Sequence, residues 1–300
     1  MNILITNDDG IYAYGIIELA RELSKIANIY VVAPDSQRSA TGHAITLHSP
    51  IMVKEEYIDE NIKAYSISGT PADCVKIGIE GLFKDINIDL VLSGINNGSN
   101  LGTDVIYSGT VSAALEGFIL NKPSIAISYN DLNVKKEVYR QASKYIVHLI
   151  NNIKDKFDLL NDCILNVNIP ATEIKGYKIT KLGKRCYDQV MEERISPFGQ
   201  KYFWVKGTMK ELEQEEDSDI ACVNEGYIYI TPVNIEMTNL NKINILKNIK
   251  MIWYTHPILG VYDLAETYER IFDISMENLD RFLNNKELFN IIDFNTGYIK

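Results

Sequence analysis

Short apolar runs alternate with helical stretches through the first half of this chain, and that alternation limits the folds open to it. Runs rich in β-branched and apolar residues predict strands at Asn2–Ile5, Ile29–Ala33, Ile51–Tyr57, Lys63–Ile67, Asp89–Ser93 and Pro123–Ser128. Helices are predicted at Gly15–Ala27, from Pro71 to about Leu82, at Thr110–Leu120 and at Val134–Asn151. Since strands separated by helices need right-handed crossovers, the pattern predicts a parallel α/β sheet in a three-layer sandwich.

The second half of the chain has a different pattern, with more strands than helices. Strand-like runs occur at Cys163–Ile169, Tyr177–Leu182 and Tyr227–Thr231. The segment from Arg185 to Gly207 places a proline and a glycine among aromatic residues, which predicts a protruding hairpin arm. Such an arm can pack on another subunit or fold as a self-contained flap. After about residue 247 the pattern is helical again, with helices predicted at Tyr262–Phe272 and Met276–Leu283.

Composition excludes several classes of protein. The 300 residues are 46% hydrophobic, which suits one large α/β domain or one domain with an appendage. A formal net charge of -10 argues against a nucleic-acid duplex as partner. No apolar run is long enough to span a membrane, and Met1 leads straight into a strand rather than a secretory leader. The four cysteines form no CxxC pair, so we expect reduced thiols and a cytoplasmic protein.

Two adjacent carboxylates follow the first predicted strand, in the sequence Asn7-Asp8-Asp9-Gly10. Ligands of open α/β sheets bind beyond the carboxyl ends of the strands. Neighbouring carboxylates repel each other unless a positive charge lies between them, which points to a metal cation. An aspartate-rich turn that only caps the next helix is the alternative, and the position alone does not decide between the two.

Two more polar loops follow predicted strands, at Ala33–His43 and Ser93–Asp104. Neighbouring strands lie about 5 Å apart, so these loops can converge on the first one. Their carboxylate, hydroxyl and amide oxygens suit Mg²⁺, Mn²⁺ or Ca²⁺ better than zinc. His43 is the only imidazole nearby, and a single loop histidine is more often a hydrogen-bonding residue than a ligand.

Ser108, Gly109 and Thr110 lie where a helix is predicted to begin. The free N–H groups and the dipole at that end form an anion site, although Ser108 or Thr110 can equally be an ordinary N-cap. Gly69–Asp73 opens another helix in the same way. A cation facing an anion-binding helix end is the arrangement that a phosphomonoesterase needs, because the cation activates water while the donors hold the developing charge.

Five stretches, in order, resemble those of the SurE family, the metal-dependent survival-protein nucleotidases that act on nucleoside 5′- and 3′-monophosphates. They spread over about the first 240 residues and read NDDG, VAPDSQRSATGHAIT, SGTPADCV, SGINNGSNLGTDVIYSGTVSAALEG and GYIYITPVNIEMT. The resemblance implies a 5′-nucleotidase with one divalent ion per subunit, Mg²⁺ or Mn²⁺. It also implies that Asp8, Asp9, Ser39 and Asn96 are the metal ligands.

The family's fold is a Rossmann-like α/β/α sandwich with a β-rich extension that is exchanged between subunits. We therefore expect a SurE-like phosphatase domain over residues 1–247, with the arm and extension at about 185–231, and a homodimer or homotetramer. The helical tail at 248–300 has no counterpart in the family pattern. It could cover the sheet, extend an interface or lie loosely on the surface.

Roles for the remaining residues follow from this reading. Asp8, Asp9 and Asp104 are the expected catalytic acids, with Asp104 either transferring protons or only orienting its loop. Ser108, Gly109 and Thr110 are expected to cradle the phosphate. Arg38 can pair with phosphate or fix its loop through Asp35, and His43 can assist protons or serve structure. The attacking group, a metal-activated water or an aspartate, stays open.

Two alternatives and one departure accompany these predictions. A nucleotide-binding regulator without turnover would use the same cradle, and an oligomeric scaffold would depend chiefly on the arm and tail. Ala40 stands where relatives commonly have glycine after the serine, which puts the shape of that loop in doubt. Base selectivity would come from aromatic stacking, for which eighteen tyrosines offer too many candidates.

Overall fold

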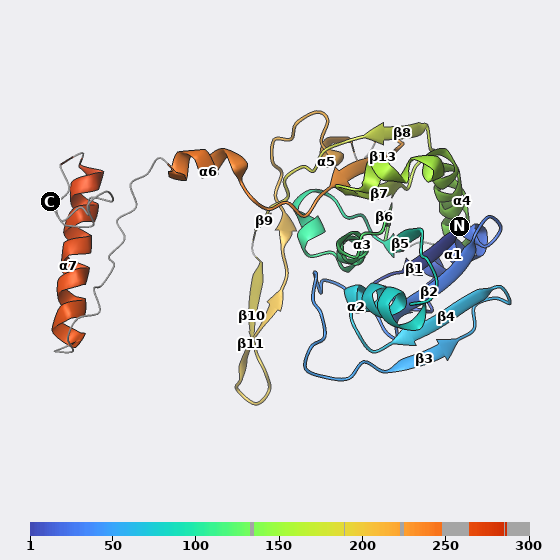
Figure 1. Cartoon of the computed structure of the whole chain (residues 1–300), viewed down its shortest axis with the longest axis horizontal. Helices are drawn as coiled ribbons and strands as arrows, with labels where there is room; N and C mark the ends of the chain where they lie inside the picture. Colours follow the sequence, from blue (N-terminus) through green and yellow to red (C-terminus); the bar gives the residue numbers. More distant parts are fainter. Residues whose placement is uncertain (133–134, 189, 223–224, 248–263, 285, 287–300) are drawn as a thin grey trace. The chain divides into compact units, whose positions relative to one another are not determined.

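A computed structural model describes residues 1–132, 135–188, 190–222, 225–247, 264–284 and 286 (Figure 1). The chain divides into two compact units, Met1–Ile235 and Glu236–Lys300. Most of the tail predicted at 248–300 lies outside the described residues, so the boundary expected after residue 247 stays a prediction. No helix in the described ranges is both long enough and apolar enough to cross a membrane.

The first unit is built on a nine-stranded sheet. Its strands lie in the order β3 (Val53–Glu56), β4 (Ile62–Ile67), β2 (Asn28–Pro34), β1 (Asn2–Thr6), β5 (Leu90–Asn97), β6 (Ser124–Asn130), β7 (Ile164–Pro170), β13 (Tyr227–Val233) and β8 (Gly176–Ile179). The six from β4 to β7 are mutually parallel, while β3 and β13 pair antiparallel with their neighbours β4 and β7. The predicted parallel α/β sheet is confirmed.

The alternation of side chains along β1 divides the core into two faces. Ile3 and Ile5 join a cluster with α1 (Tyr14–Leu23) and α4 (Lys136–Ile153). Leu4 points the opposite way, into a cluster with α2 (Pro71–Ile77) and α3 (Gly109–Ile119). All three β1 residues are fully buried, so the sheet is covered on both faces. That is the predicted three-layer sandwich (Figure 1).

Two predicted elements differ in extent from those observed. The helix expected from Pro71 to about Leu82 ends as α2 at Ile77 and continues as a π-helix, η1 (Gly78–Leu82), in which the Phe83 N–H donates to the Gly78 carbonyl. The two helices expected in the tail are one in the described range, α7 (Leu264–Leu283), because no glycine or proline interrupts the stretch between them.

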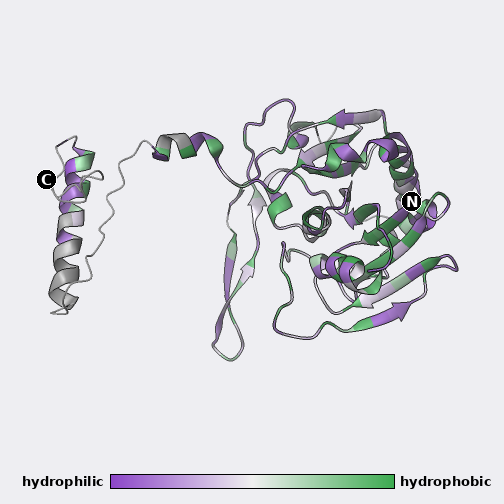
Figure 2. Cartoon of the chain, viewed as in Figure 1, coloured by the Kyte–Doolittle hydropathy of each residue, from purple (hydrophilic) through white to green (hydrophobic). Residues whose placement is uncertain are grey.

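The predicted hairpin arm consists of β10 (Met191–Ile195) and β11 (Lys201–Val205), paired antiparallel outside the layers of the sandwich (Figure 1). At its base β9 (Tyr187–Asp188) pairs with β12 (Thr208–Met209). Hydrophobic and hydrophilic residues both occur along the hairpin (Figure 2), and all of β11 is exposed. β13, by contrast, lies within the main sheet, so the last part of the expected β-rich extension completes the sandwich.

Gly15 marks the closest approach between a helix and the sheet edge that carries the polar loops. A Cβ at this position would lie 2.0 Å from the Ile95 carbonyl oxygen, whereas a Cβ at Gly81 would meet nothing nearer than 3.8 Å. Since a backbone oxygen cannot move aside without shifting the loop, only glycine fits at the start of α1.

We expect Gly15→Ala to lower the free energy of unfolding by about 3 kcal/mol through overpacking. The matched variant Gly81→Ala should change it by no more than about 1 kcal/mol. Urea denaturation of both variants measures the difference. Equal stabilities for the two variants would contradict the close contact between α1 and the residue preceding Asn96.

Candidate active site at the carboxyl ends of the parallel strands

The three polar loops meet at one edge of the sheet, where β1, β2 and β5 end side by side. The Arg38 backbone N–H of the second loop donates to the Asp8 carbonyl of the first, at 2.7 Å. From the third loop, the Asn97 N–H donates to Asp9 Oδ2 at 3.0 Å. The structure therefore brings together the loops that the sequence predicted would converge.

Asp8 lies at the centre of this edge and is 5% exposed. Its Oδ1 accepts a hydrogen bond from Thr110 Oγ1 at 2.6 Å. A Cβ at Gly109 would come within 2.8 Å of the Asp8 Cβ, so the start of α3 lies directly against this side chain. Burial raises the pKa of Asp8 to about 6, opposed by the Thr110 hydrogen bond and reinforced by the charge of Asp9.

Asp9 is half-buried beside it, and burial raises its pKa too, against the hydrogen bond from the Asn97 N–H. In the described part of the chain, no lysine, arginine or histidine forms an ion pair with either Asp8 or Asp9. Two neighbouring acids are thus held in a desolvated position without a positive partner from the protein. A bound cation would remove this electrostatic cost, so the pair fits a metal ion.

The other two expected ligands supply neutral oxygens. Ser39 is exposed, and its Oγ accepts from Gln37 Nε2 at 2.9 Å, an amide that also reaches Asp9 Oδ1 at 3.5 Å. Asn96 is half-buried and donates through Nδ2 to the Gly98 carbonyl, which leaves its Oδ1 as an acceptor. The described residues contain no group of three or more His, Cys, Asp or Glu side chains arranged to hold a metal. A donor set of two carboxylates and neutral oxygens suits a hard cation.

Ala40 adopts the backbone conformation that a glycine would have at this position in the second loop. Its φ is 55°, in the left-handed region that glycine adopts freely and that costs other residues about 1–2 kcal/mol. The loop keeps a glycine-like backbone next to Ser39 despite the alanine.

At the start of α3, one side chain caps the helix and another holds Asp8. Ser108 is the N-cap, and its Oγ accepts from the Val111 N–H at 3.1 Å. The Thr110 hydroxyl is engaged with Asp8. The cap predicted as an alternative is therefore present. Because the first N–H groups of a helix have no backbone partner within it, those that Ser108 and Asp8 do not engage remain suited to an anion.

Arg38 and His43 make contacts away from the two acids. Arg38 Nη2 donates to the Ser68 carbonyl at 3.1 Å and reaches Asp35 Oδ1 at 3.4 Å. His43 Nε2 lies 2.8 Å from Oε2 of Glu116, a residue of α3 that is 3% exposed. The structure thus ties both side chains to neighbouring loops and helices.

Asp104 takes part in an ion pair that the sequence did not predict. Its Oδ2 accepts from Arg185 Nη1 and from the Tyr187 hydroxyl, both at 2.7 Å. Asp104 lies in a 3₁₀ helix, η2 (Gly102–Ile106), while both donors come from the base of the arm. These partners are 81 and 83 residues away in sequence, so no local pattern could have identified them.

Asp219 also holds this junction together, and it was not identified from the sequence. It is fully buried, and its carboxylate accepts from the N–H groups of Gly102 and Gly183, each at 2.8 Å. Burial raises its pKa, while the hydrogen bonds from the backbone lower it. One carboxylate therefore joins the η2 loop to the segment that carries Arg185.

A third attachment holds the loop between β5 and η2. The Asn100 carbonyl accepts from the side-chain amides of Asn166 and Asn168, at 2.8 and 3.0 Å. Asn168 Oδ1 accepts in turn from the Asn100 N–H, and Asn100 Nδ2 donates to Ser128 Oγ. This buried amide network anchors the loop on β6 and β7.

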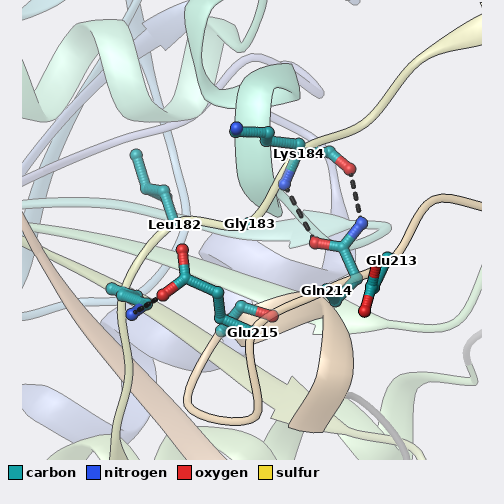
Figure 3. A pocket seen from close by; sticks show the side chains of 8 residues that line it. Leu182, Gly183, Lys184, Glu213, Gln214 and Glu215 are labelled. Atoms are coloured by element: carbon teal, nitrogen blue, oxygen red, sulfur yellow. Dashed lines mark hydrogen bonds and ion pairs between the residues drawn. The ribbon is translucent and has the colours of Figure 1, made fainter.

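A cavity of about 310 Å³ lies beside the Asp219 junction (Figure 3). The Gln214 side chain spans it, accepting from the Lys184 N–H and donating to the Lys184 carbonyl. Lys181 pairs with Glu215 and Asp217. The contacts of Gln214 with Lys184 and of Glu215 with Lys181 therefore join the two segments that line the cavity.

Comparison with known proteins gives a consistent picture. The model of the family described as "Survival protein SurE" matches residues 3–189. A protein named 5′-nucleotidase SurE from Alkaliphilus metalliredigens is 48% identical over 255 residues, covering 84% of this chain and 99% of the relative. One of the same name from Petrotoga mobilis is 46% identical over 83% of this chain and 98% of its own length.

Among solved structures, the crystal structure of the SurE protein from Aquifex aeolicus superposes with a TM-score of 0.70 at 37% identity. It covers 83% of this chain and 100% of the other. Part of this chain therefore has no counterpart in that structure.

We expect Asp219→Asn to lower the free energy of unfolding by about 2 kcal/mol, because the amide nitrogen would face one of the two N–H donors. Amide hydrogen exchange should accelerate in the peptides that contain Gly102 and Gly183. The control is Asp217→Asn, whose exposed ion pair with Lys181 is worth no more than about 1 kcal/mol. Unchanged exchange at both glycines would contradict the clamp.

Proposed function

This chain belongs to the survival protein SurE family, and we propose that it is a metal-dependent nucleotidase that hydrolyses nucleoside 5′-monophosphates to nucleoside and phosphate. Three relatives named 5′-nucleotidase SurE, 46% to 48% identical over 82% to 84% of this chain, support the activity. The structural observation that carries the proposal is the adjacent pair of a buried Asp8 and a half-buried Asp9, in which Asp8 lies against the start of α3 and neither acid has a cationic partner among the described residues. Nucleoside 3′-monophosphates belong to the same proposal.

The metal site consists of Asp8, Asp9, Ser39 and Asn96, with Mg²⁺ or Mn²⁺ as the ion and one ion per subunit. When bound, such an ion supplies positive charge to the phosphoryl oxygens and lowers the pKa of a water molecule. Thr110 holds Asp8 in one orientation through the 2.6 Å hydrogen bond, which keeps this ligand in place before the ion arrives.

The phosphate lies at the start of α3, where Ser108, Gly109 and Thr110 surround it. The N–H groups at the helix start that Ser108 and Asp8 do not engage, such as that of Gly109, donate to its oxygens, and the helix dipole favours the negative charge. Because these donors are fixed by the helix, they need no reorganisation as charge develops during hydrolysis. Gly109 allows the phosphate cradle and Asp8 to lie in direct contact.

The contacts of Asp104, Arg38 and His43 support positioning roles for all three. Asp104 is paired with Arg185 and Tyr187, so it orients the loop that leads into Ser108 rather than standing free for proton transfer. Arg38 fixes its loop to Ser68 and Asp35. His43 is held by Glu116. A regulator without turnover would use the same cradle, but the nucleotidase relatives favour catalysis.

We expect Asp8→Asn to reduce kcat/KM for a nucleoside 5′-monophosphate at least about 100-fold and to weaken binding of Mn²⁺ in calorimetry. Asparagine keeps the shape and can still accept from Thr110, so the fold should remain intact by circular dichroism. The exposed Asp85→Asn serves as control and should leave activity unchanged. Full activity of Asp8→Asn with undiminished metal binding would rule out the ligand assignment.

The same assay on the unaltered protein tests whether hydrolysis depends on a divalent metal ion. A chelator should abolish hydrolysis of both a nucleotide and a generic aryl phosphate, and added Mg²⁺ or Mn²⁺ should restore it. Hydrolysis that persists in the chelator would count against the mechanism.

For assembly, we propose a homodimer or homotetramer in which the hairpin arm is exchanged between subunits. The support is the exposure of large apolar side chains on β10, β11 and the turn between them, with Phe198 91% exposed and Val205 78%. Isolated hairpins are marginal in water, so an arm of this kind gains stability by packing on another surface. The cytoplasmic location expected from the sequence stays a prediction.

We expect Phe198→Ser combined with Val205→Ser to lower the molar mass measured by light scattering at a given protein concentration, because the arm loses apolar area that would be buried in the assembly. Leu159→Ser, which removes an exposed apolar side chain outside the arm, should leave the mass unchanged. An unaltered mass for the arm variant would refute the exchanged arm.

A further inference from the structure

We propose that the Tyr107 ring stacks on the base of the substrate and gives the enzyme its preference for nucleotides over smaller phosphate monoesters. This inference rests on the nucleotidase function proposed above and assigns the residue that recognises the nucleoside. Stacking on an aromatic face tolerates every base, since each has a π-face of its own.

Tyr107 is placed next to the phosphate cradle. It immediately precedes Ser108, so the two Cα atoms are about 3.8 Å apart. The Tyr107 side chain is 66% exposed, whereas Ser108 is 6% exposed and Thr110 is fully buried. The chain thus turns from exposed to buried within three residues at the edge of the proposed phosphate cradle.

The Tyr107 backbone is held from two sides. Its N–H donates to the Asp104 carbonyl at 3.0 Å, and its carbonyl accepts from the Gly42 N–H of the second loop at 3.1 Å. Asp104 is itself fixed by Arg185. In the described part of the chain no hydrogen bond or ring contact engages the Tyr107 side chain. A rigid backbone therefore presents a free ring, and a tyrosine loses little conformational entropy on binding.

Other exposed aromatic residues fit this role less well. Tyr12, after the first loop, donates its hydroxyl to Glu56 Oε2 on β3 at 2.7 Å. Tyr14 begins α1 and is 55% exposed, but in the sequence it follows the metal loop and does not adjoin the cradle. Tyr57 is 77% exposed in the turn between β3 and β4, at the opposite edge of the sheet because β4 runs parallel to β2. The remaining large exposed rings of the described chain are Tyr187, Phe198, Tyr202, Phe203 and Trp204 in the arm or at its base, and Phe282 in α7.

The test compares adenosine 5′-monophosphate with glycerol 2-phosphate, a phosphate monoester that has neither ribose nor base, under the same Mn²⁺ concentration. We expect Tyr107→Ala to lower kcat/KM for the nucleotide about tenfold, mainly through KM, and to change kcat/KM for glycerol phosphate less than about twofold. Tyr107→Phe keeps the π-face and should stay within about twofold of the unaltered enzyme on both substrates. Tyr57→Ala is the matched control and should resemble the unaltered enzyme.

The possible results distinguish base stacking by Tyr107 from the proposed nucleotidase activity. An unchanged nucleotide kcat/KM in Tyr107→Ala would overturn stacking, as would an equal loss on both substrates, because the ring would then serve the phosphate cradle. A tenfold loss in Tyr107→Phe would assign the effect to the hydroxyl and overturn stacking too. If the unaltered enzyme hydrolysed neither substrate, the nucleotidase proposal itself would fall, and the role of Tyr107 with it.

Discussion

The hydrogen bond from Thr110 to Asp8 is the contact on which the rest of the site depends. It joins the end of β1 to the start of α3 across 102 residues of sequence, at 2.6 Å. Gly109 makes the approach possible, because any side chain there would collide with Asp8. A carboxylate for the cation and a helix end for the anion are thereby placed side by side. Neither the loop nor the helix alone would provide both a ligand for a cation and hydrogen-bond donors for an anion.

This arrangement places the two carboxylates of Asp8 and Asp9 side by side with no positively charged side chain of the described residues paired to them. Burial raises the pKa of both Asp8 and Asp9, so the protein pays electrostatically for holding them together. The compensating donors are a threonine hydroxyl and the Asn97 N–H, which are neutral. A divalent cation would supply what these donors lack, and the oxygens of Ser39 and Asn96 would suit it. Relief of this electrostatic cost would then favour binding of the cation.

The sequence predicted the strands, the order of the loops and their convergence, because burial on both faces and turn chemistry leave local patterns. Asp8 and Asp9 could be found from such a pattern. The partners of Asp104 could not, since Arg185 contributes no periodic signal and approaches from the arm base. Asp219 was missed for the same reason: a buried carboxylate that binds two backbone N–H groups looks, in sequence, like any acidic residue in a loop.

The attachments of the third loop fit a site that, under the proposed function, would be strict about phosphate and tolerant about the base. Asn168 and Asp219 fix its backbone from the sheet and from the arm base, so the donors of α3 keep their positions. Fixed backbone groups discriminate sharply, because a misplaced anion loses every hydrogen bond at once. The proposed nucleoside side offers an exposed ring instead of buried donors, and a ring accepts any flat partner. Selectivity for the phosphate would then follow from burial, and breadth for the base from exposure, within two adjacent residues of one loop.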